Sequence, residues 1–520
     1  MMSGKIDIKP LLGLLGVLIA ALSAEFNDQV VGVVMPDLRG ALGVGHDPGT
    51  WLESLYVSGE VLGMCFSPWW MYTLSLRKLV LTVLSVNCLT SICIPQCENL
   101  TLLFSLRWIQ GLSGGLTIPL LMATALRALP PPIRLWGLAV YALTATFTPN
   151  LSVTLAALWS DVVGWQFGFY ESIFLCSVAA ALCSTFLWRD PTHFERLRQF
   201  DWRGSLLAFI CLSSLSTFLI QGDRLDWFNS PLICVLILLT VVSFPLFVIN
   251  ENRHPLPLVK LPLLKRPNLL YGVIALFTLL LINAASSSLP VMYLTEVQGY
   301  RPINAHLITL EIGLTQLIFL PSMAVLLNRE RVDPRVVSFI GVSLFFCACI
   351  GESFVTSSWN REQFYGWQLV FSLALAMIVV PLLQMATNSI QPPEGAFAAG
   401  IVNTPRAISE AVGLWLLDLI ERWRGGLHSS RITDQLGRRR FEVVQSNGYL
   451  PQHPTPLLPD GAPRFDGSLE WFSHTVRAEV TTLTVSDAYL VFAAISIGLM
   501  LLIVTLPIRT YAPRIALMKK

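Results

Sequence analysis

Charged residues are scarce in this sequence. Asp, Glu, Lys and Arg make up only 13% of its 520 residues, whereas soluble domains carry about 25%. The net charge is only +2, and no block of basic residues suggests a nucleic-acid partner. Hydrophobic residues reach 54% and the mean hydropathy is +0.62. This composition indicates an all-α membrane protein with many spans.

Motifs for catalysis or metal binding are missing as well. The chain contains no phosphate-binding P-loop and no HExxH zinc motif, and its seven histidines are scattered. Its ten cysteines show neither metal-ligand spacing nor the framework of a secreted disulfide protein. We therefore expect no enzyme, no metal site and no cofactor. The first apolar run, 11–36, lacks a matched signal-peptide cleavage site, which favours a first spanning helix.

Long apolar runs are abundant. At about 20 residues per span, we count fourteen transmembrane helices, in the ranges 11–36, 50–72, 78–96, 101–125, 133–160, 165–188, 204–221, 230–250, 268–292, 303–327, 335–355, 365–388, 397–420 and 487–511. Lysine and arginine gather in the short loops of one side, and only Arg39, Arg224, Arg301 and Arg361 occupy short loops opposite. Both termini are therefore expected to be cytoplasmic.

Similar basic loops follow the second and the tenth span, which suggests an internal duplication. We expect a cytoplasmic N-terminus at 1–10, a six-helix half at 11–188, two additional helices at 189–267, a second six-helix half at 268–511 and a cytoplasmic tail at 512–520. Duplicated transporters bind substrate between their halves and rock one half against the other. The long polar loop 421–486 could hold a docking surface, or it could be a mobile solvated segment.

A few charges lie deep inside the predicted spans. They are Glu25, Asp28, Glu60, Arg107, Glu171, Glu311, Arg406 and Glu410. A lipid-facing arginine would cost at least about 2.5 kcal/mol, so Arg107 should face the bundle interior and have a partner. Counting about 1.5 Å per residue from the span ends places Asp28 at a similar depth and Glu25 slightly deeper. We expect Asp28 as the first partner of Arg107 and Glu25 as the second.

Several segments of the chain carry a family resemblance. They are GTWLESLYV at 49–57, RWIQGLSGG at 107–115, DRLDWFNSPLI at 223–233, HPLPLVKLPLLKRPNLL at 254–270, Asp333-Pro334-Arg335, and Asn403 with Arg406 and Gly413. In this order they resemble the fourteen-helix drug:proton antiporter branch of the major facilitator superfamily, the group of the EmrB and QacA exporters. The resemblance implies the major facilitator fold and proton-driven export of small amphipathic compounds across a bacterial inner membrane.

The chain departs from this family in places. The usual first-helix aspartate reads Asn27, with the acid one place later at Asp28 and an added Glu25. The fifth-helix antiporter motif appears as TPNLSVTLAAL at 148–158 and keeps Pro149. The loop after the second helix keeps Arg77 and Lys78 without the expected glycines and aspartate. Glu60, Glu171 and Glu410 also stand where the family tends to have uncharged residues. These departures indicate a divergent member whose substrate is cationic or rich in hydroxyl and amine groups.

Residue roles follow from the buried charges and from the resemblance. For proton coupling we expect Glu25, Asp28 and Arg107. For the substrate path we expect Trp51, Tyr56, Glu60, Gln110, Phe169, Glu171, Glu311, Arg406 and Glu410. For conformational change we expect Arg77, Lys78, Gly111, Gly115, Pro149, Asp333 and Arg335. Static ion pairs, Arg107 with Asp28 or Arg406 with Glu410, are the structural alternative to proton coupling.

Expected partners are a small-molecule substrate, protons and the lipid bilayer, with no nucleic acid. A periplasmic membrane-fusion adaptor and an outer-membrane channel are further candidates, reached through 421–486. Three other functions stay open: export of an endogenous metabolite or siderophore, import or facilitated passage of a metabolite, and a receptor or assembly subunit that transports nothing.

Overall fold

The computed structural model describes residues 8–129, 134–329, 331–388, 390–391, 394–438 and 468–505. These residues are mostly helical, and no strand occurs among them. The α-helices are α1 (Ile8–Leu42), α2 (His46–Leu74), α3 (Leu76–Cys93), α4 (Leu100–Ala128), α5 (Arg134–Thr146), α6 (Thr148–Val162), α7 (Phe167–Phe186), α8 (Trp202–Gln221), α9 (Pro231–Arg253), α10 (Pro267–Glu296), α11 (Pro302–Ala305), α12 (Leu307–Leu327), α13 (Pro334–Glu352), α14 (Arg361–Asn388), α15 (Gly395–Ile420), α16 (Gly426–Arg438) and α18 (Ser468–Val504). Shorter helical segments are η1 (Ile94–Gln96), η3 (Phe194–Gln199), η4 (Trp227–Asn229), η5 (Leu261–Lys265) and η7 (Glu421–Gly425).

Many of these helices can cross a bilayer. Within the described ranges, eleven are long and apolar enough to do so, or twelve if the bent pair α5 and α6 forms one span. The chain is thus a multi-pass, all-α membrane protein, as predicted. The long helices α2 and α15, which carry several of the buried charges, fall outside this apolar set. Each predicted range overlaps a helix or a helix pair, but the number of fourteen spans stays a prediction.

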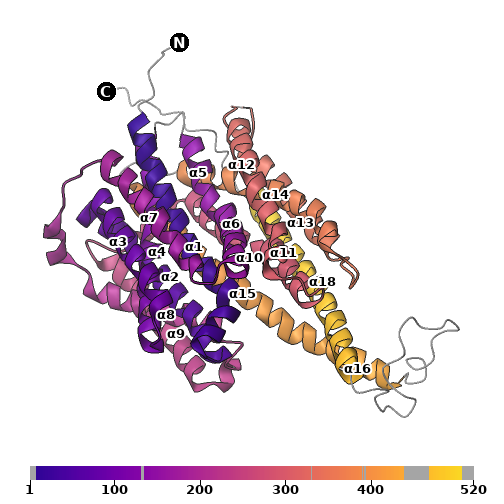
Figure 1. Cartoon of the computed structure of the whole chain (residues 1–520). Helices are drawn as coiled ribbons and strands as arrows, with labels where there is room; N and C mark the ends of the chain where they lie inside the picture. The colour runs from indigo at the N-terminus through magenta and orange to yellow at the C-terminus, as the bar shows by residue number, and fades with distance from the viewer. Residues whose placement is uncertain are drawn as a thin grey trace.

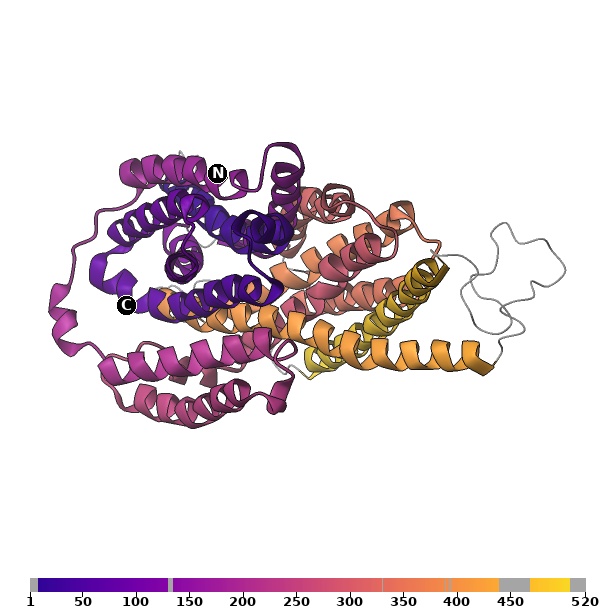
Figure 2. The ribbon, with the colours of Figure 1, turned by 60° about the horizontal axis from the view of Figure 1, so that its bottom comes forward.

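The helices form two groups that face each other (Figure 1). We name α1–α7 the first group and α10–α18 the second group. They meet along a seam, where α15 packs on α2 and α4 while α12 and α14 pack on α5. The additional helices α8 and α9 lie together along one edge, and α8 contacts both α2 and α15 (Figure 2). We name the end of the bundle where α1 and α10 begin the predicted cytoplasmic end; the boundaries predicted for the two halves stay a prediction.

Close packing of α2 on α4 fixes the centre of the first group. A Cβ atom added to Gly111 would lie 2.1 Å from the Tyr56 carbonyl oxygen, and one added to Gly115 would lie 1.9 Å from that of Glu60. Glycine on α2 permits the same approach, since a Cβ on Gly59 would lie 2.4 Å from a backbone oxygen of α4. The close neighbour that the GxxxG spacing predicts is therefore α2.

The range 133–160, predicted as one helix, is divided. α5 and α6 are separated at Phe147 and bent by 40°. Pro149 stands in the first turn of α6, where its missing N–H and fixed φ start a new helix rather than continue the preceding one.

The interpretation of 421–486 as a loop is wrong for its described residues, 421–438 and 468–486, which are helical. α15 continues through η7 into α16, and α18 begins at Ser468, well before the predicted start at 487. Arg424 and His428 both contact the Asp487 carboxylate, at 2.7 and 2.5 Å. α16 and the part of α18 that precedes 487 are rich in polar residues and contain no long apolar run, which explains the error. Figure 1 shows α16 and the start of α18 projecting beyond the other helices.

Candidate functional site

Arg406 joins the two helix groups in the middle of the molecule. This side chain of α15 is 2% exposed, and its Nη2 donates to Glu25 Oε1 on α1 at 2.5 Å. The same guanidinium donates to the hydroxyl and the carbonyl of Thr144 on α5, at 3.1 and 3.0 Å. Its Nε lies 3.4 Å from Glu410 Oε1, one turn along α15. The expected pair of Arg406 with Glu410 is present, but the shorter contact crosses the seam.

Arg107 has a different environment from the one predicted. It is 1% exposed, and its Nη1 donates to Gln110 Oε1 at 2.6 Å and to the Asn27 carbonyl at 3.1 Å. The guanidinium lies 4.3 Å from the centre of the Tyr56 ring. Within the described part of the chain, no carboxylate lies within salt-bridge distance of Arg107.

The predicted pairing of Arg107 with Asp28 is therefore wrong. Successive residues of a helix point about 100° apart, so a carboxylate at 28 leaves the helix in another direction than a side chain at 27. Asp28 is half-buried and accepts a hydrogen bond from Gln29 at 2.8 Å. The second candidate, Glu25, is bound to Arg406. Depth along a span was predictable, whereas the direction of each side chain was not.

Asn27 lies within a buried network of neutral polar groups. Its amide donates to Asn87 at 2.9 Å and accepts from Ser172 at 3.0 Å, while Gln110 donates to Ser91 at 3.1 Å. These bonds join α1, α3, α4 and α7. Asn87 and Ser172 are not among the predicted site residues, although polar residues that recur inside apolar runs are a signal that could have identified them.

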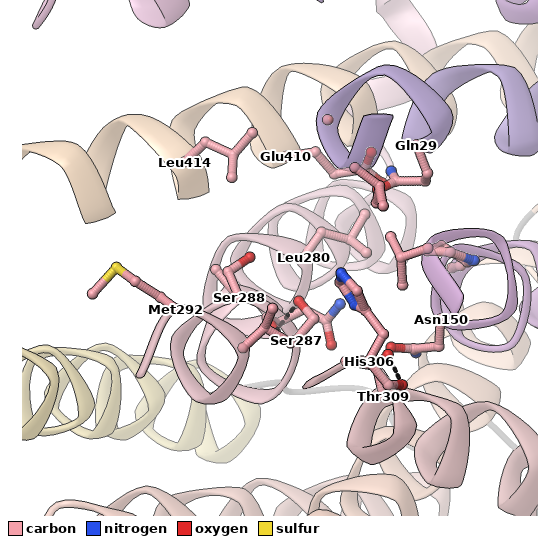
Figure 3. A pocket seen from close by; sticks show the side chains of 18 of the residues that line it. Gln29, Asn150, Leu280, Ser287, Ser288, Met292, His306, Thr309, Glu410 and Leu414 are labelled. Atoms are coloured by element: carbon pink, nitrogen blue, oxygen red, sulfur yellow. Dashed lines mark hydrogen bonds between the residues drawn. The ribbon is translucent and has the colours of Figure 1, made fainter. Parts of the chain in front are cut away.

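A cavity of about 410 Å³ lies between the two groups, toward the predicted outer end (Figure 3). It is within the size range of sites for small organic ligands. Glu410, with its side chain 34% exposed, is the carboxylate of its wall. Figure 3 shows Glu410 beside Gln29, with His306 and Thr309 on the opposite side. Together with amides such as Asn283, this wall offers one negative charge and several hydrogen-bonding groups.

Further acids gather beside the cavity. Glu60 on α2 is 5% exposed and lies close enough to Glu25, Asp28 and Glu410 for their charges to interact. This part of the predicted acidic layer is thus assembled, with Arg406 as the arginine that bonds to it directly.

Several of the predicted substrate-path residues lie elsewhere. Glu171 accepts a hydrogen bond from the Trp159 indole at 2.6 Å, between α6 and α7. Glu311 on α12 has a buried carboxylate oxygen without a hydrogen bond among the described residues. Three predicted residues do not line the cavity: Glu171, Glu311 and the half-buried Trp51. Tyr56, Gln110 and Phe169 surround Arg107 instead. The Arg107 guanidinium carbon lies 4.3 Å from the centre of the Tyr56 ring and 6.0 Å from that of the Phe169 ring, and Nη1 donates to Gln110 at 2.6 Å.

The residues expected to support conformational change mostly form contacts within their own helix group rather than across the seam. Arg77 donates to the Ser184 carbonyl on α7, and Lys78 is exposed. Asp333 caps α13 by accepting from the Arg335 amide at 3.0 Å. Pro149, at the bend between α5 and α6, is part of the cavity wall.

Comparisons with known proteins agree with this architecture. The model of the Major Facilitator Superfamily matches residues 17–414. The "Probable multidrug resistance protein EmrY" of Escherichia coli K12 is 26% identical over 420 residues, covering 80% of this chain and 81% of that protein. The "Multidrug export protein EmrB" of the same strain is 25% identical over 425 residues, with the same coverage. The crystal structure of the human organic anion transporter MFSD10 superimposes with a TM-score of 0.56 at 14% identity, over 94% of this chain and 99% of that one.

Proposed function

Since this chain belongs to the Major Facilitator Superfamily, we propose that it exports small amphipathic organic compounds, such as drugs, across the bacterial cytoplasmic membrane in exchange for protons. Both termini would be cytoplasmic. The main support is the ion pair of Arg406 with Glu25, which crosses the seam next to a cavity shared by both groups. Alternating access requires such contacts between the halves to form and break.

In the proposed cycle, the proton and Arg406 compete for Glu25. Ionised Glu25 binds Arg406 and holds α1 against α15. Protonation removes the negative charge, so the attraction is lost and the two groups can separate at this level. Asp28 and Glu60, whose charges interact with that of Glu25, would pass protons to this site.

Glu410 would connect substrate binding to the same arginine. Its carboxylate reaches both the cavity and Arg406, so a positively charged group in the cavity competes with Arg406 for Glu410. The guanidinium is then held by Glu25 and Thr144 alone. We propose Gln29, Asn150 and the hydroxyls of α10 as the hydrogen-bonding groups that orient the substrate.

Arg107 would act as a positioning residue. It contacts the backbone of α1 at Asn27 and, at 3.5 Å, the backbone of α2 at Leu52, so it fixes the helix that carries Glu25 and Asp28. Its positive charge also acts on Asp28 without direct contact.

Transport into inverted vesicles under an imposed pH gradient tests this proposal. We expect the double variant Glu25→Gln, Asp28→Asn to lose gradient-driven uptake of a cationic dye while it still binds the dye. Glu171→Gln, which alters a carboxyl outside the cavity, is the matched control and should transport normally. Uptake at the wild-type rate in the double variant would refute proton coupling through these acids.

The projecting helices α16 and α18 would be the contact site for a periplasmic adaptor, which would lead to an outer-membrane channel. Their polar, ion-paired surfaces extend beyond the bundle on the predicted outer side. Co-purification with the adaptor encoded in the same host, lost when 426–486 is replaced by a short flexible linker, would support this partner.

A further inference from the structure

An aromatic pair closes the seam near the predicted cytoplasmic end. Tyr72 of α2 stacks on Phe397 of α15 with ring centres 5.3 Å apart and planes inclined by 22°. One ring belongs to each helix group. A second cavity, of about 580 Å³, lies against this pair, and its remaining wall comes from the connections that precede α8 and α10. This cavity is separate from the one that Glu410 lines.

Two cations of this cavity form no salt bridge with a carboxylate among the described residues. The Arg196 guanidinium carbon lies 5.4 Å from the centre of the Tyr72 ring, and Lys260 Nζ lies 4.3 Å from that of Phe397. Across the described ranges, neither cation is within salt-bridge distance of a carboxylate. Arg196 Nε is buried and has no hydrogen bond to any of the described residues. Cation–π contacts leave N–H donors such as these available to an anion.

The other charged or titratable groups of the wall do not cancel these cations. Glu195 is exposed and contributes one negative charge, and His193 is an exposed imidazole whose backbone N–H donates to the Thr73 carbonyl at 2.9 Å. In the neighbouring depression, Arg127 and Asp190 are paired with each other at 2.6 Å. Glu394, whose charge acts on Lys260 from nearby, is paired with Arg266 at 2.7 Å. The cavity therefore has an excess of positive charge.

The segment that supplies Arg196 has the composition of a bilayer interface. Phe194 is 53% exposed, and Trp202, just after this segment, is 76% exposed. Arg198 and Arg203 alternate with these apolar side chains. Aromatic rings and basic side chains concentrate at the depth of lipid headgroups. This composition favours a position of the segment at the depth of the headgroup phosphates.

We propose that this cavity binds a phosphate group between Arg196 and Lys260, and that the bound phosphate holds the Tyr72–Phe397 contact closed. The non-bridging oxygens of a phosphate can accept from a guanidinium and an ammonium at once. The group can come from an anionic phospholipid or from a soluble phosphate ester. The effect on closure rests on the proposed alternating access, whereas binding does not.

Thermal unfolding of the full chain in nanodiscs tests binding. Phosphatidylglycerol, compared with phosphatidylcholine, should raise the unfolding midpoint of the wild type. Arg196→Gln and Lys260→Gln should each lower the apparent affinity for phosphatidylglycerol by about tenfold, since each removes a charge-assisted hydrogen bond. Arg198→Gln, a change on the same segment but outside the cavity wall, should keep the full response. Glu195→Gln should strengthen it.

Two further measurements identify the source of the phosphate and its effect on the Tyr72–Phe397 contact. Glycerol 3-phosphate or inorganic phosphate, added to phosphatidylcholine nanodiscs, should give the same shift only if a soluble anion occupies the cavity. Hydrogen exchange of 70–75 and 395–400 should slow when the anion binds, because the seam is held closed.

The proposal is overturned if no phosphate source shifts the wild type, or if Arg198→Gln weakens the response as much as Arg196→Gln does. Should the Arg196 and Lys260 variants fail to fold, an unchanged response in Glu195→Gln would overturn it as well. The transport variant Glu25→Gln should respond like the wild type, so failure of the proposed export function would leave this result standing.

Discussion

Arg406 Nη2 lies 2.5 Å from Glu25 Oε1, and this contact joins two residues that are 381 positions apart in the sequence. Both side chains are 2% exposed, so each charge depends on the other for compensation.

Removing one member of this pair should be costly. We expect Arg406→Ala to destabilise the protein by about 3–5 kcal/mol, because it leaves Glu25 buried without its partner. The double variant Arg406→Ala, Glu25→Ala should recover a large part of that loss. Thermal unfolding of the two single variants and the double variant, treated as a double-mutant cycle, measures the coupling. Strictly additive effects would mean that the pair contributes nothing.

Glu410 should select for positively charged substrates. In Glu410→Gln we expect the KM for a cationic dye to rise about tenfold, through loss of a charge-assisted interaction, while a neutral compound of similar size is affected little. Transport kinetics with both compounds provide the comparison. An equal rise for the neutral compound would indicate a general distortion of the cavity.

The position of the first-helix acid can be moved back by one residue. Asp28→Asn alone should impair gradient-driven export, and adding Asn27→Asp should restore part of it, because the Asn27 backbone accepts from Arg107 and its side chain lies in the polar network that Gln110 joins to Arg107. The measurement is export at several imposed pH gradients. No improvement of the double variant over Asp28→Asn would show that the acid acts from its own place rather than through Arg107.

The glycines of α4 should be intolerant of alanine. Gly115→Ala would force a methyl group to within 1.9 Å of the Glu60 carbonyl oxygen, so α2 and α4 must separate, with a loss of about 1–3 kcal/mol. Gly366→Ala on α14, where an added Cβ meets nothing within 4 Å, is the control. Similar unfolding midpoints for the two variants would contradict the close packing.

Acid should weaken the contact between the starts of α10 and α15. Arg266 donates two hydrogen bonds to Glu394, at 2.7 and 2.9 Å, and they hold the pKa of that carboxyl below its ordinary 4.5. The stabilisation is therefore present above pH 4.5 and is lost as the pH falls through the lower, folded-state value. Glu394→Gln should be less stable than the wild type at pH 7, and the difference should shrink in strong acid. A constant difference from pH 7 to 3 would contradict this assignment.

The spans were predictable because crossing a bilayer requires a length of apolar sequence, and that length can be counted directly. Counting also placed Glu25, Asp28 and Arg107 at compatible depths. It did not identify what Arg107 touches, since a backbone carbonyl such as that of Asn27 is available at every position and leaves no mark in the sequence.

Two other features depended on contacts between distant residues. Glu25 meets Arg406 only after the two groups assemble, so spacing along the chain contains no sign of it. α16 and the first part of α18, on either side of 439–467, are rich in polar residues, and pairs such as Arg424 with Asp487 stabilise this region. Apolar periodicity therefore does not reveal them.

The unbroken helical path from α15 through η7 to α16 acts as a lever. At about 1.5 Å per residue, its far end at Arg438 is about 48 Å from Arg406, so a tilt of about 10° at Arg406 would move that end by about 8 Å. A fluorophore attached near 438 would then report, from outside the bilayer, whether the buried arginine holds Glu25.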